Sequence, residues 1–321
     1  MKKILVTLPV EARHKAYFEN IGKDCVFEYV QSSEVTEAQL QDVSIIIGNV
    51  PENMLESAGN LEWLQLNSAG ADSYCKPGVL KPGTLLTNAT GAYGLAISEY
   101  MVGTALMLQK KLNLYYENQR NHHWNDEGSV TSIWGSTTLV IGLGDIGGEF
   151  ATRMKVLGSH TIGIRRKSGA KPEYLDELYT NEQLDEVIPR ADFISLSLPN
   201  TPETYHIIDE KRLRSMKKGA FLINVGRGTA IDTDALVKVL NEGHLGGCAL
   251  DVTDPEPLPP GHPLWDAKNA VITPHISGQY HLQETLERII RIAGSNLEKF
   301  LNGDRLDNLV NFETGYRERQ S

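Results

Sequence analysis

The chain has 321 residues and a formal net charge of −10, and 40% of its residues are hydrophobic and 22% are charged. This length predicts about two domains, and the composition is that of an ordinary globular protein. The acidic balance disfavours a nucleic-acid partner, because a phosphate backbone requires a basic protein surface. No stretch approaches the roughly 20 apolar residues of a membrane span, so no membrane association is expected.

Cysteine and histidine usage points away from metal and redox sites. Cys25, Cys75 and Cys248 lie far apart, and the sequence contains no C-x-x-C pair. Neither a zinc ribbon nor a redox pair is therefore predicted, and a reducing, cytoplasmic compartment fits best. His122 and His123 are adjacent but lack a carboxylate or cysteine ligand at a recognised metal spacing, so no metal is expected.

The first 92 residues alternate between short apolar runs and polar helical patterns. The N-terminus, MKKILVTLPV, begins like a signal peptide, but Glu11, Arg13 and His14 break its short apolar run and favour a first β-strand. The alternation predicts a small parallel sheet with helices on its faces. The expected strands are Lys3–Leu8, Val26–Val30, Ser44–Ile47, Trp63–Leu66 and Leu85–Thr87, and the expected helices include Glu34–Gln41 and Glu52–Ser57.

Two further segments precede the centre of the chain. Apolar spacing predicts a long helix from Ala96 to Leu112 that crosses between the domains. The aromatic-rich segment from Tyr115 to Trp134 is expected to be covered, either by a dimer partner or by the body of the same chain. Ser68–Asp72 follows a strand end, and its small residues leave backbone amides open to an anion; spacing alone favours a plain tight turn.

A glycine loop lies between a predicted strand and a predicted helix. The strand Thr137–Ile141 runs into Gly142-Leu143-Gly144-Asp145-Ile146-Gly147, and a second strand follows the helix at Thr161–Ile164. Gly142 permits a tight turn, Gly144 lets the backbone approach a pyrophosphate, and Gly147 lets the helix pack close to the sheet. This context predicts a dinucleotide site. Gly148 follows the loop where a P-loop would have lysine, so a P-loop is excluded.

More strand–helix units follow, and polar residues gather where their strands end. Arg227, Asp251, Glu256 and His275 lie at or just beyond such ends, where doubly wound sheets bind ligands. Taken singly, Arg227 could link strand ends, Glu256 could be a solvated loop charge, and His275 could be a buried histidine. The expected elements are strands Phe193–Leu198, Phe221–Val225, Cys248–Val252 and Val271–Thr273, helices Glu210–Met216 and Ala235–Leu240 capped by Asp209 and Asp232, a long helix from about residue 283, and a polar tail from Gly315 to Ser321.

Five motifs in this order resemble those of the D-isomer-specific 2-hydroxyacid dehydrogenase family, and the resemblance covers nearly the whole chain. They are the glycine loop 142–147, Leu198-Pro199-Asn200-Thr201-Pro202-Glu203-Thr204, Asn224-Val225-Gly226-Arg227-Gly228, Leu250-Asp251-Val252 with Glu256-Pro257-Leu258, and Thr273-Pro274-His275-Ile276-Ser277-Gly278.

The resemblance implies an α/β protein of two doubly wound parallel-sheet domains. A discontinuous, flavodoxin-like substrate domain would comprise residues 1–94 and 284–321, and a Rossmann cofactor domain would comprise residues 95–283. The substrate would lie in the cleft between them, and closure would exclude water. The family usually forms dimers through the long helix and the arm after it, so a homodimer is expected.

The resemblance also implies residue roles. His275 would protonate the substrate carbonyl oxygen as the hydride arrives, which suits an imidazole that titrates near neutral pH. Glu256 would pair with His275, and Arg227 would bind the carboxylate and polarise the carbonyl. Ala69 and Gly70 would bind the carboxylate through N–H groups, and Asp251 would accept a hydrogen bond from the nicotinamide carboxamide. The cofactor-binding residues implied are Gly142, Gly144, Asp145, Ile146, Gly147, Arg165, Arg166, Pro199, Thr204, Val225, Gly226, Asp251, Ser277 and Gly278.

One position departs from the pattern of the NAD-preferring members. They carry an acid at the end of the second strand for the ribose 2′-hydroxyl, and this chain has Arg165 there, followed by Arg166. Guanidinium groups would bind a 2′-phosphate that an acid would repel, so NADP(H) is the expected cofactor, with NAD(H) possible. Asp145 is a counter-signal, because it adds negative charge near the pyrophosphate.

The sequence therefore predicts an NADP(H)-dependent oxidoreductase that reduces a small 2-oxo acid such as glyoxylate or hydroxypyruvate. An NAD-dependent phosphoglycerate or D-lactate-type dehydrogenase is the rival within the family. A nucleotide-sensing, corepressor-like binding protein stays open, because such relatives keep the same residues. A hydrolase that uses Ser277 beside His275 is disfavoured, since the sequence has no G-x-S-x-G elbow.

Overall fold

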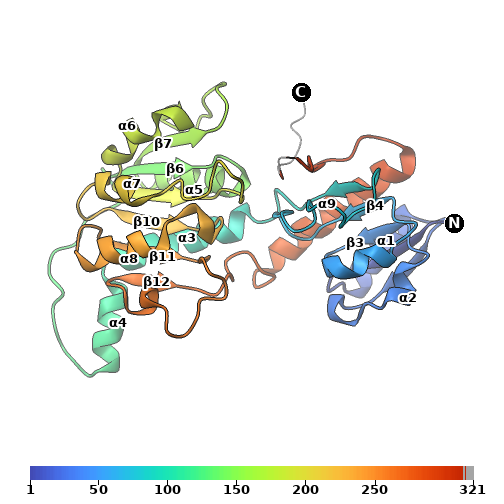
Figure 1. Cartoon of the computed structure of the whole chain (residues 1–321), viewed down its shortest axis with the longest axis horizontal. Coiled ribbons are helices and arrows are strands. Elements are labelled where there is room, and N and C mark those ends of the chain that lie inside the picture. Colours follow the sequence, from blue (N-terminus) through green and yellow to red (C-terminus); the bar gives the residue numbers. More distant parts are fainter. Residues whose placement is uncertain (314, 316–321) are drawn as a thin grey trace. The chain divides into compact units, whose positions relative to one another are not determined.

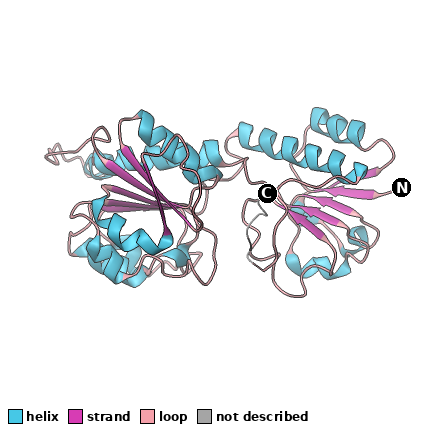
Figure 2. Ribbon diagram, turned by 90° about the horizontal axis from the view of Figure 1, so that it is seen from above, coloured by secondary structure: helices cyan, strands magenta, loops and turns pink. Residues whose placement is uncertain are grey.

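The computed structural model describes residues 1–313 and 315, so only Gly315 of the predicted polar tail lies among the described residues. The chain folds as two compact units (Figure 1). The first unit comprises residues 1–93 together with the chain from Tyr280 on, and the second comprises Gly94–Gln279. In each unit, helices cover both faces of a sheet of parallel strands (Figure 2), which confirms the predicted α/β class.

The first unit has a five-stranded sheet in the order β2-β1-β3-β4-β5, the order of flavodoxin-like folds. All five predicted strands are confirmed, with ends that differ by two residues at most. The strands are β1 (Lys3–Val6), β2 (Val26–Tyr29), β3 (Ile45–Ile47), β4 (Trp63–Gln65) and β5 (Leu85–Thr87), and the helices are α1 (Ala12–Ile21), η1 (Ser32–Glu34), α2 (Glu37–Leu40), η2 (Glu52–Ser57) and α9 (Gln283–Asn302).

The helices of this unit differ more from the prediction. The helix expected over Glu34–Gln41 was wrong in its extent, because Val35 and Thr36 are extended and Thr36 caps the short α2. The segment Glu52–Ser57 is a 3₁₀ helix. Helix α1 was not predicted; its buried face consists of His14 and Phe18, which is too little to give a periodic apolar pattern.

The C-terminal segment completes the core of the first unit. In α9, the ring of Phe300 stacks on Trp63 with centroids 5.3 Å apart, and Asn296 Nδ2 donates to Gln65 Oε1 at 2.8 Å. Past α9, the N–H of Val310 donates to the carbonyl of Leu86, in β5, at 2.9 Å. The two ends of the sequence therefore build one sheet and its cover.

The second unit has a seven-stranded sheet in the order β12-β11-β10-β9-β6-β7-β8. The order reverses between β6 and β9, which are neighbours, as in a Rossmann fold. Its strands are β6 (Thr137–Ile141), β7 (His160–Arg165), β8 (Glu177–Thr180), β9 (Phe193–Leu196), β10 (Phe221–Asn224), β11 (Gly247–Leu250) and β12 (Ala270–Ile272), and its helices are α3 (Gly94–Gln109), α4 (Leu112–Arg120), α5 (Asp145–Val156), η3 (Asn181–Gln183), α6 (Leu184–Val187), η4 (Ile188–Arg190), α7 (Glu210–Ser215), η5 (Gly228–Ala230), α8 (Thr233–Asn241) and η6 (Pro263–Asp266).

The predicted caps in this unit are confirmed. Asp209 accepts a hydrogen bond from the N–H of Arg212 at 2.9 Å, and Asp232 accepts one from Ala235 at 3.1 Å. The predicted long helix ends earlier than expected, because Lys111 adopts a left-handed φ of 57° and α4 begins after it. Strand β8 at the sheet edge was not predicted.

The aromatic segment after α3 stays exposed in the single chain. Trp124 is fully exposed, Trp134 is 79% exposed and Tyr116 is 63% exposed. Within the second unit, the described residues therefore leave these three rings largely uncovered. In the described part of the chain, none of the helices has the length and apolar character needed to cross a membrane.

Candidate active site

The predicted catalytic residues follow three neighbouring strands of the second sheet. Arg227 comes after β10, Glu256 after β11 and His275 after β12. These strands are parallel and adjacent, so their carboxyl ends meet at one edge of the sheet. The topology thus gathers the three side chains from positions 48 residues apart in sequence (275 − 227).

His275 and Glu256 form a direct pair. His275 Nδ1 lies 2.7 Å from Glu256 Oε1, and the two side chains are 49% and 42% exposed. A carboxylate at Nδ1 favours a proton on that nitrogen and leaves Nε2 as the atom that can exchange a proton with a ligand. The backbone of His275 is left-handed, with φ of 53°, which is unusual for a residue with a Cβ.

The turn that carries Arg227 is held by a buried asparagine. Asn224 Oδ1 accepts from the N–H of Gly226 at 3.0 Å, and Asn224 Nδ2 donates to the carbonyl of Arg227 at 2.9 Å. Next to Arg227, a Cβ on Gly228 would lie 2.0 Å from the carbonyl of Thr253. The Arg227 turn therefore packs directly on the loop that leads to Glu256, and Arg227 Nη1 donates to the carbonyl of Gly226 at 2.9 Å.

Asp251 lies beneath the loop that carries His275. Its carboxylate is 1% exposed and accepts hydrogen bonds from Thr273 Oγ1 at 2.6 Å and from the N–H groups of Ile276 and Ser277 at 2.9 and 3.0 Å. The hydroxyl of Ser277 also donates to Asp251. This bond engages the Ser277 hydroxyl with a carboxylate rather than with His275, which is a further argument against a serine hydrolase.

The glycine loop fits a dinucleotide pyrophosphate. Gly142 has a φ of 97°, and a Cβ on Gly147 would lie 1.9 Å from the carbonyl of Gly142. A Cβ on Gly144 would meet no described heavy atom within 4 Å, so the backbone there is open to a ligand. Helix α5 begins at Asp145, so its first N–H groups point toward this opening. The carboxylate of Asp145 accepts from the N–H of Gly94 at 2.8 Å.

The two predicted cofactor-binding arginines, Arg165 and Arg166, lie at the end of β7. Arg165 is the last residue of β7 and Arg166 follows it. Arg165 Nη2 donates to the carbonyl of Ala170 at 3.2 Å, and its Nε is a buried donor without a hydrogen-bond partner in the described structure. The Arg165 guanidinium thus packs against the turn at Gly169 and Ala170.

The remaining predicted cofactor residues also lie at the carboxyl ends of strands in this sheet. Thr204 is buried in the loop after β9, and its hydroxyl donates to the carbonyl of Pro199 at 2.7 Å. The others lie in the first turn of α5, after β10 and after β12, and are Ile146, Val225, Gly226, Ser277 and Gly278.

Ala69 and Gly70 belong to the first unit and follow β4. Ser68 Oγ donates to the carbonyl of Gly70 at 2.7 Å, and Asn88 Nδ2 donates to the carbonyl of Ala69 at 2.7 Å. Their carbonyls are thus tied back, while their N–H groups donate to no described residue. The chain bends at residues 67–69, and this segment presents the two N–H groups of Ala69 and Gly70 as donors.

Asn67 anchors this turn and was missed by sequence reasoning. Its Oδ1 accepts from the N–H of Asn49 at 2.6 Å, and its own N–H donates to Asn49 Oδ1 at 3.0 Å. Asn67 also contacts the hydroxyls of Tyr93 and Tyr280. Desolvation raises the pKa of Tyr93, and partial burial raises the pKa of Tyr280 to about 12. Reciprocal asparagines have no spacing signature that a sequence would display.

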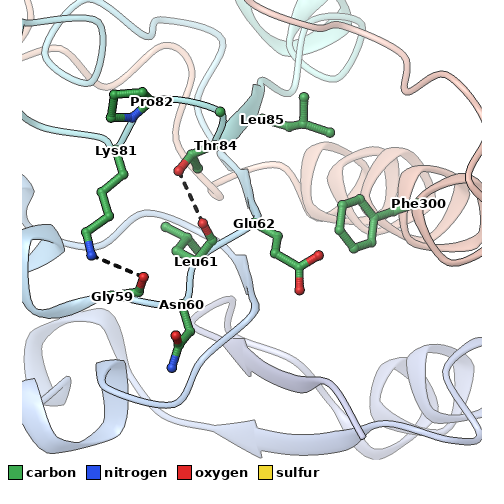
Figure 3. Close-up of a pocket in the computed structure, with 10 residues that line it drawn as sticks. Gly59, Asn60, Leu61, Glu62, Lys81, Pro82, Thr84, Leu85 and Phe300 are labelled. Carbon is green, nitrogen blue, oxygen red and sulfur yellow. Dashed lines mark hydrogen bonds between the residues drawn. The ribbon is translucent and has the colours of Figure 1, made fainter.

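A separate hollow in the first unit contains none of the predicted residues. Its lining residues are those just before β4, those that lead into β5, and Phe300 of α9 (Figure 3). Lys81 Nζ donates to the carbonyl of Gly59 at 3.1 Å, and Glu62 pairs with Lys2 at 2.6 Å, so its charged groups already have partners. No cluster of three metal-ligating side chains occurs among the residues that the structure describes.

Known proteins resemble this chain both in sequence and in three-dimensional structure. The family model for “D-isomer specific 2-hydroxyacid dehydrogenase, NAD binding domain” matches residues 102–277, which include Arg227, Glu256 and His275. The chain belongs to the D-isomer-specific 2-hydroxyacid dehydrogenase family. A glyoxylate reductase from Thermofilum pendens is 34% identical over 276 residues, which span 84% of this chain and 80% of that protein.

One further relative in sequence and one solved structure also match most of this chain. A D-3-phosphoglycerate dehydrogenase from Methanocaldococcus jannaschii is 28% identical over 316 residues, which span 97% of this chain and 60% of that protein. The solved structure of a D-isomer specific 2-hydroxyacid dehydrogenase family protein from Aeromonas salmonicida covers 97% of this chain and 99% of its own, with a TM-score of 0.83 and 30% identity. The predicted family is confirmed, and the chain is an NAD(P)-dependent oxidoreductase.

Proposed function

We propose that this dehydrogenase reduces small 2-oxo acids such as glyoxylate or hydroxypyruvate, with NADP(H) preferred over NAD(H). The observation that carries the proposal is the His275–Glu256 pair beside the Arg227 turn, at the edge that also holds the glycine loop. The resemblance to a glyoxylate reductase at 34% identity supports a small substrate.

The roles follow from the donors and acceptors at this edge. Arg227 binds the substrate carboxylate and carbonyl with its forked donors, which draws electron density toward the carbonyl oxygen. His275 gives the proton on Nε2 to that oxygen, and Glu256 at Nδ1 stabilises the charged imidazolium before transfer. When bound, the nicotinamide supplies the hydride. In the reverse direction, His275 takes the proton from the 2-hydroxyl group.

We assign cofactor binding to the second unit and substrate carboxylate binding, through the N–H groups of Ala69 and Gly70, to the first. In the second unit, Gly142, Gly144 and Gly147 would hold the pyrophosphate. The carboxylate of Asp251 is 1% exposed and already accepts from four protein donors, so we assign Asp251 to the support of the 273–277 loop rather than to the nicotinamide carboxamide.

NADP(H) preference is supported by the two guanidinium groups of Arg165, the last residue of β7, and Arg166, which follows it. Arg165→Asp is expected to weaken NADPH binding by about 100-fold, with a much smaller effect on NADH, because a carboxylate repels the 2′-phosphate. Fluorescence titration of both dinucleotides measures this. Lys218→Asp is the matched control, since Lys218 is exposed and lies before β10, at the opposite edge of the same sheet. Equal loss for both dinucleotides would contradict the assignment.

The substrate is tested by a spectrophotometric panel of glyoxylate, hydroxypyruvate, pyruvate and longer 2-oxo acids, each with NADPH and NADH. Fast turnover of a small 2-oxo acid with NADPH is the expected result. Turnover restricted to NADH would favour the phosphoglycerate or D-lactate type of dehydrogenase. Tight dinucleotide binding without turnover across the panel would favour a nucleotide-sensing, corepressor-like protein.

We also propose a homodimer in the cytoplasm. The exposed rings of Tyr116, Trp124 and Trp134 support a partner copy on this segment, and the unpaired cysteines support a reducing compartment. Analytical ultracentrifugation of the wild-type chain and of Trp124→Ser tests the dimer. A monomeric wild type at micromolar concentration would contradict it.

A further inference from the structure

Three side chains from different elements form a connected line behind the His275 loop. The hydroxyl of Tyr100, on α3, lies 2.7 Å from Thr273 Oγ1, just after β12. Thr273 Oγ1 lies 2.6 Å from Asp251 Oδ1, just after β11. Neither Tyr100 nor Thr273 has a role in the proposed reaction. Both residues lie within the second unit.

The direction of these hydrogen bonds follows from their chemistry. An ionised carboxylate can only accept, so the single hydroxyl proton of Thr273 is directed to Asp251. Tyr100 must therefore donate to Thr273, which requires a protonated phenol. Burial, together with the nearby Asp251 charge, raises the pKa of Tyr100 to about 12, against the opposing effect of its bond to Thr273. The line thus has one polarity, from Tyr100 through Thr273 to Asp251.

The far end of the line holds the backbone on both sides of His275. Asp251 accepts from the N–H groups of Ile276 and Ser277, and the carbonyl of Asp251 accepts from the N–H of His275 at 2.8 Å. With the two hydroxyl donors, Thr273 and Ser277, the carboxylate has four donors, about its full capacity. A left-handed residue with a Cβ persists only where its surroundings fix it, and these bonds fix His275 at φ of 53°.

We propose that Tyr100 and Thr273 are positioning residues for proton transfer, which act by orienting Asp251 so that it clamps the 273–277 backbone and sets the direction of the His275 ring. This proposal rests on the proposed function, in which His275 exchanges the proton with the substrate. It gives α3 a part in the chemistry, although no atom of Tyr100 contacts a reacting group in the proposed mechanism.

The test compares Tyr100→Phe, Thr273→Val and the double variant with wild type. Each single substitution is expected to lower kcat about tenfold, because it removes a hydrogen bond in a line that ends on a charge. The dissociation constant for NADPH is expected to stay within about twofold, because the glycine loop is untouched. The double variant is expected to be no slower than Thr273→Val, since the phenol has no partner once Thr273 is gone.

A second readout does not depend on turnover. The His275 ring proton resonance is assigned by its loss in His275→Gln and is followed over pH 4–9 in each variant. The midpoint or chemical shift of this resonance is expected to move in Tyr100→Phe and in Thr273→Val. Thr273→Ser is expected to restore both the resonance and kcat, because it returns the hydroxyl. Tyr17→Phe, on α1 of the first unit and 41% exposed, is the control and is expected to match wild type.

Additive losses of kcat in the double variant would overturn the proposal. An unchanged His275 resonance would also overturn it, even if the melting temperature fell, because the two hydroxyls would then be serving packing alone. If Asp251→Asn weakened NADPH binding and left the resonance in place, Asp251 would serve the nicotinamide instead. If wild type turned over no 2-oxo acid, the proposed function would fail, whereas the resonance would still report whether Tyr100 orients His275.

Discussion

The two units carry the same kind of parallel sheet, yet they present different chemistry where their strands end. In the second unit, charged side chains follow neighbouring strands, and the His275–Glu256 pair lies 2.7 Å apart. In the first unit, the polar side chains at the corresponding edge turn inward, with Asn49 and Asn67 bonded to each other's backbone. What this edge presents is backbone N–H groups, at Ala69 and Gly70.

This difference teaches that topology gives the place of a site but not its chemistry. In both sheets, the residues predicted to bind ligands follow the carboxyl ends of parallel strands, where such folds bind their ligands. A proton and a guanidinium fork can only come from side chains, whereas an anion can be held by backbone donors alone. We therefore expect substitutions at the second edge to affect the chemical step, and substitutions at the first edge to affect substrate affinity.

The largest expected effect is at Arg227. Arg227→Ala should lower kcat/KM for a 2-oxo acid about 1,000-fold, because a donor that stabilises the developing oxyanion and the carboxylate is lost. Arg227→Lys should recover part of this, since it returns the charge without the planar fork. Steady-state kinetics at saturating NADPH measure both. A wild-type rate in Arg227→Ala would show that Arg227 does not take part in the chemical step.

A smaller effect is expected at the glycine loop. Gly147→Ala should raise the dissociation constant for NADPH about 10- to 100-fold, because its Cβ would lie 1.9 Å from the rigid carbonyl of Gly142. Gly148→Ala is the matched control. Its Cβ would meet the hydroxyl of Tyr174 at 3.1 Å, and that side chain can move. Isothermal titration calorimetry compares the two, and equal binding would show that the tight turn is not needed for the cofactor.

The smallest expected effect is at the first edge. Asn67→Ala should raise KM for the 2-oxo acid about fivefold and leave NADPH affinity unchanged, because it removes the acceptor of the Asn49 N–H that shapes the loop before Ala69. Asn60→Ala is the control, since Asn60 lies before β4, at the opposite end of the strands, is exposed, and donates from Nδ2 to the carbonyl of Gln41 at 3.1 Å. A fall in kcat without a change in KM would contradict the expectation that residues of the first unit affect substrate affinity rather than the chemical step.

The sequence was informative wherever a pattern was local. Apolar runs located all the strands except β8, and the predicted catalytic residues Arg227, Glu256 and His275 follow neighbouring strands at one end of the second sheet. The partners that shape this edge were not predictable. Asn224, Thr273 and Tyr100 act through side-chain bonds to residues far away in sequence, such as the 173-residue separation of Tyr100 and Thr273. Only the packed sheet brings such pairs within hydrogen-bond reach. The half-buried phenol of Tyr100 did carry a weak signal, because a partly buried tyrosine hydroxyl usually has a polar partner.

The most direct test of the account is the rate of NADPH oxidation by wild type and by His275→Gln with glyoxylate or hydroxypyruvate, with NADPH affinity measured on the same samples. We predict fast turnover by wild type, a loss of about 100-fold or more in His275→Gln, and equal NADPH binding, because only the proton donor has been removed. A His275→Gln variant that kept the wild-type rate while binding NADPH equally would contradict the central claim.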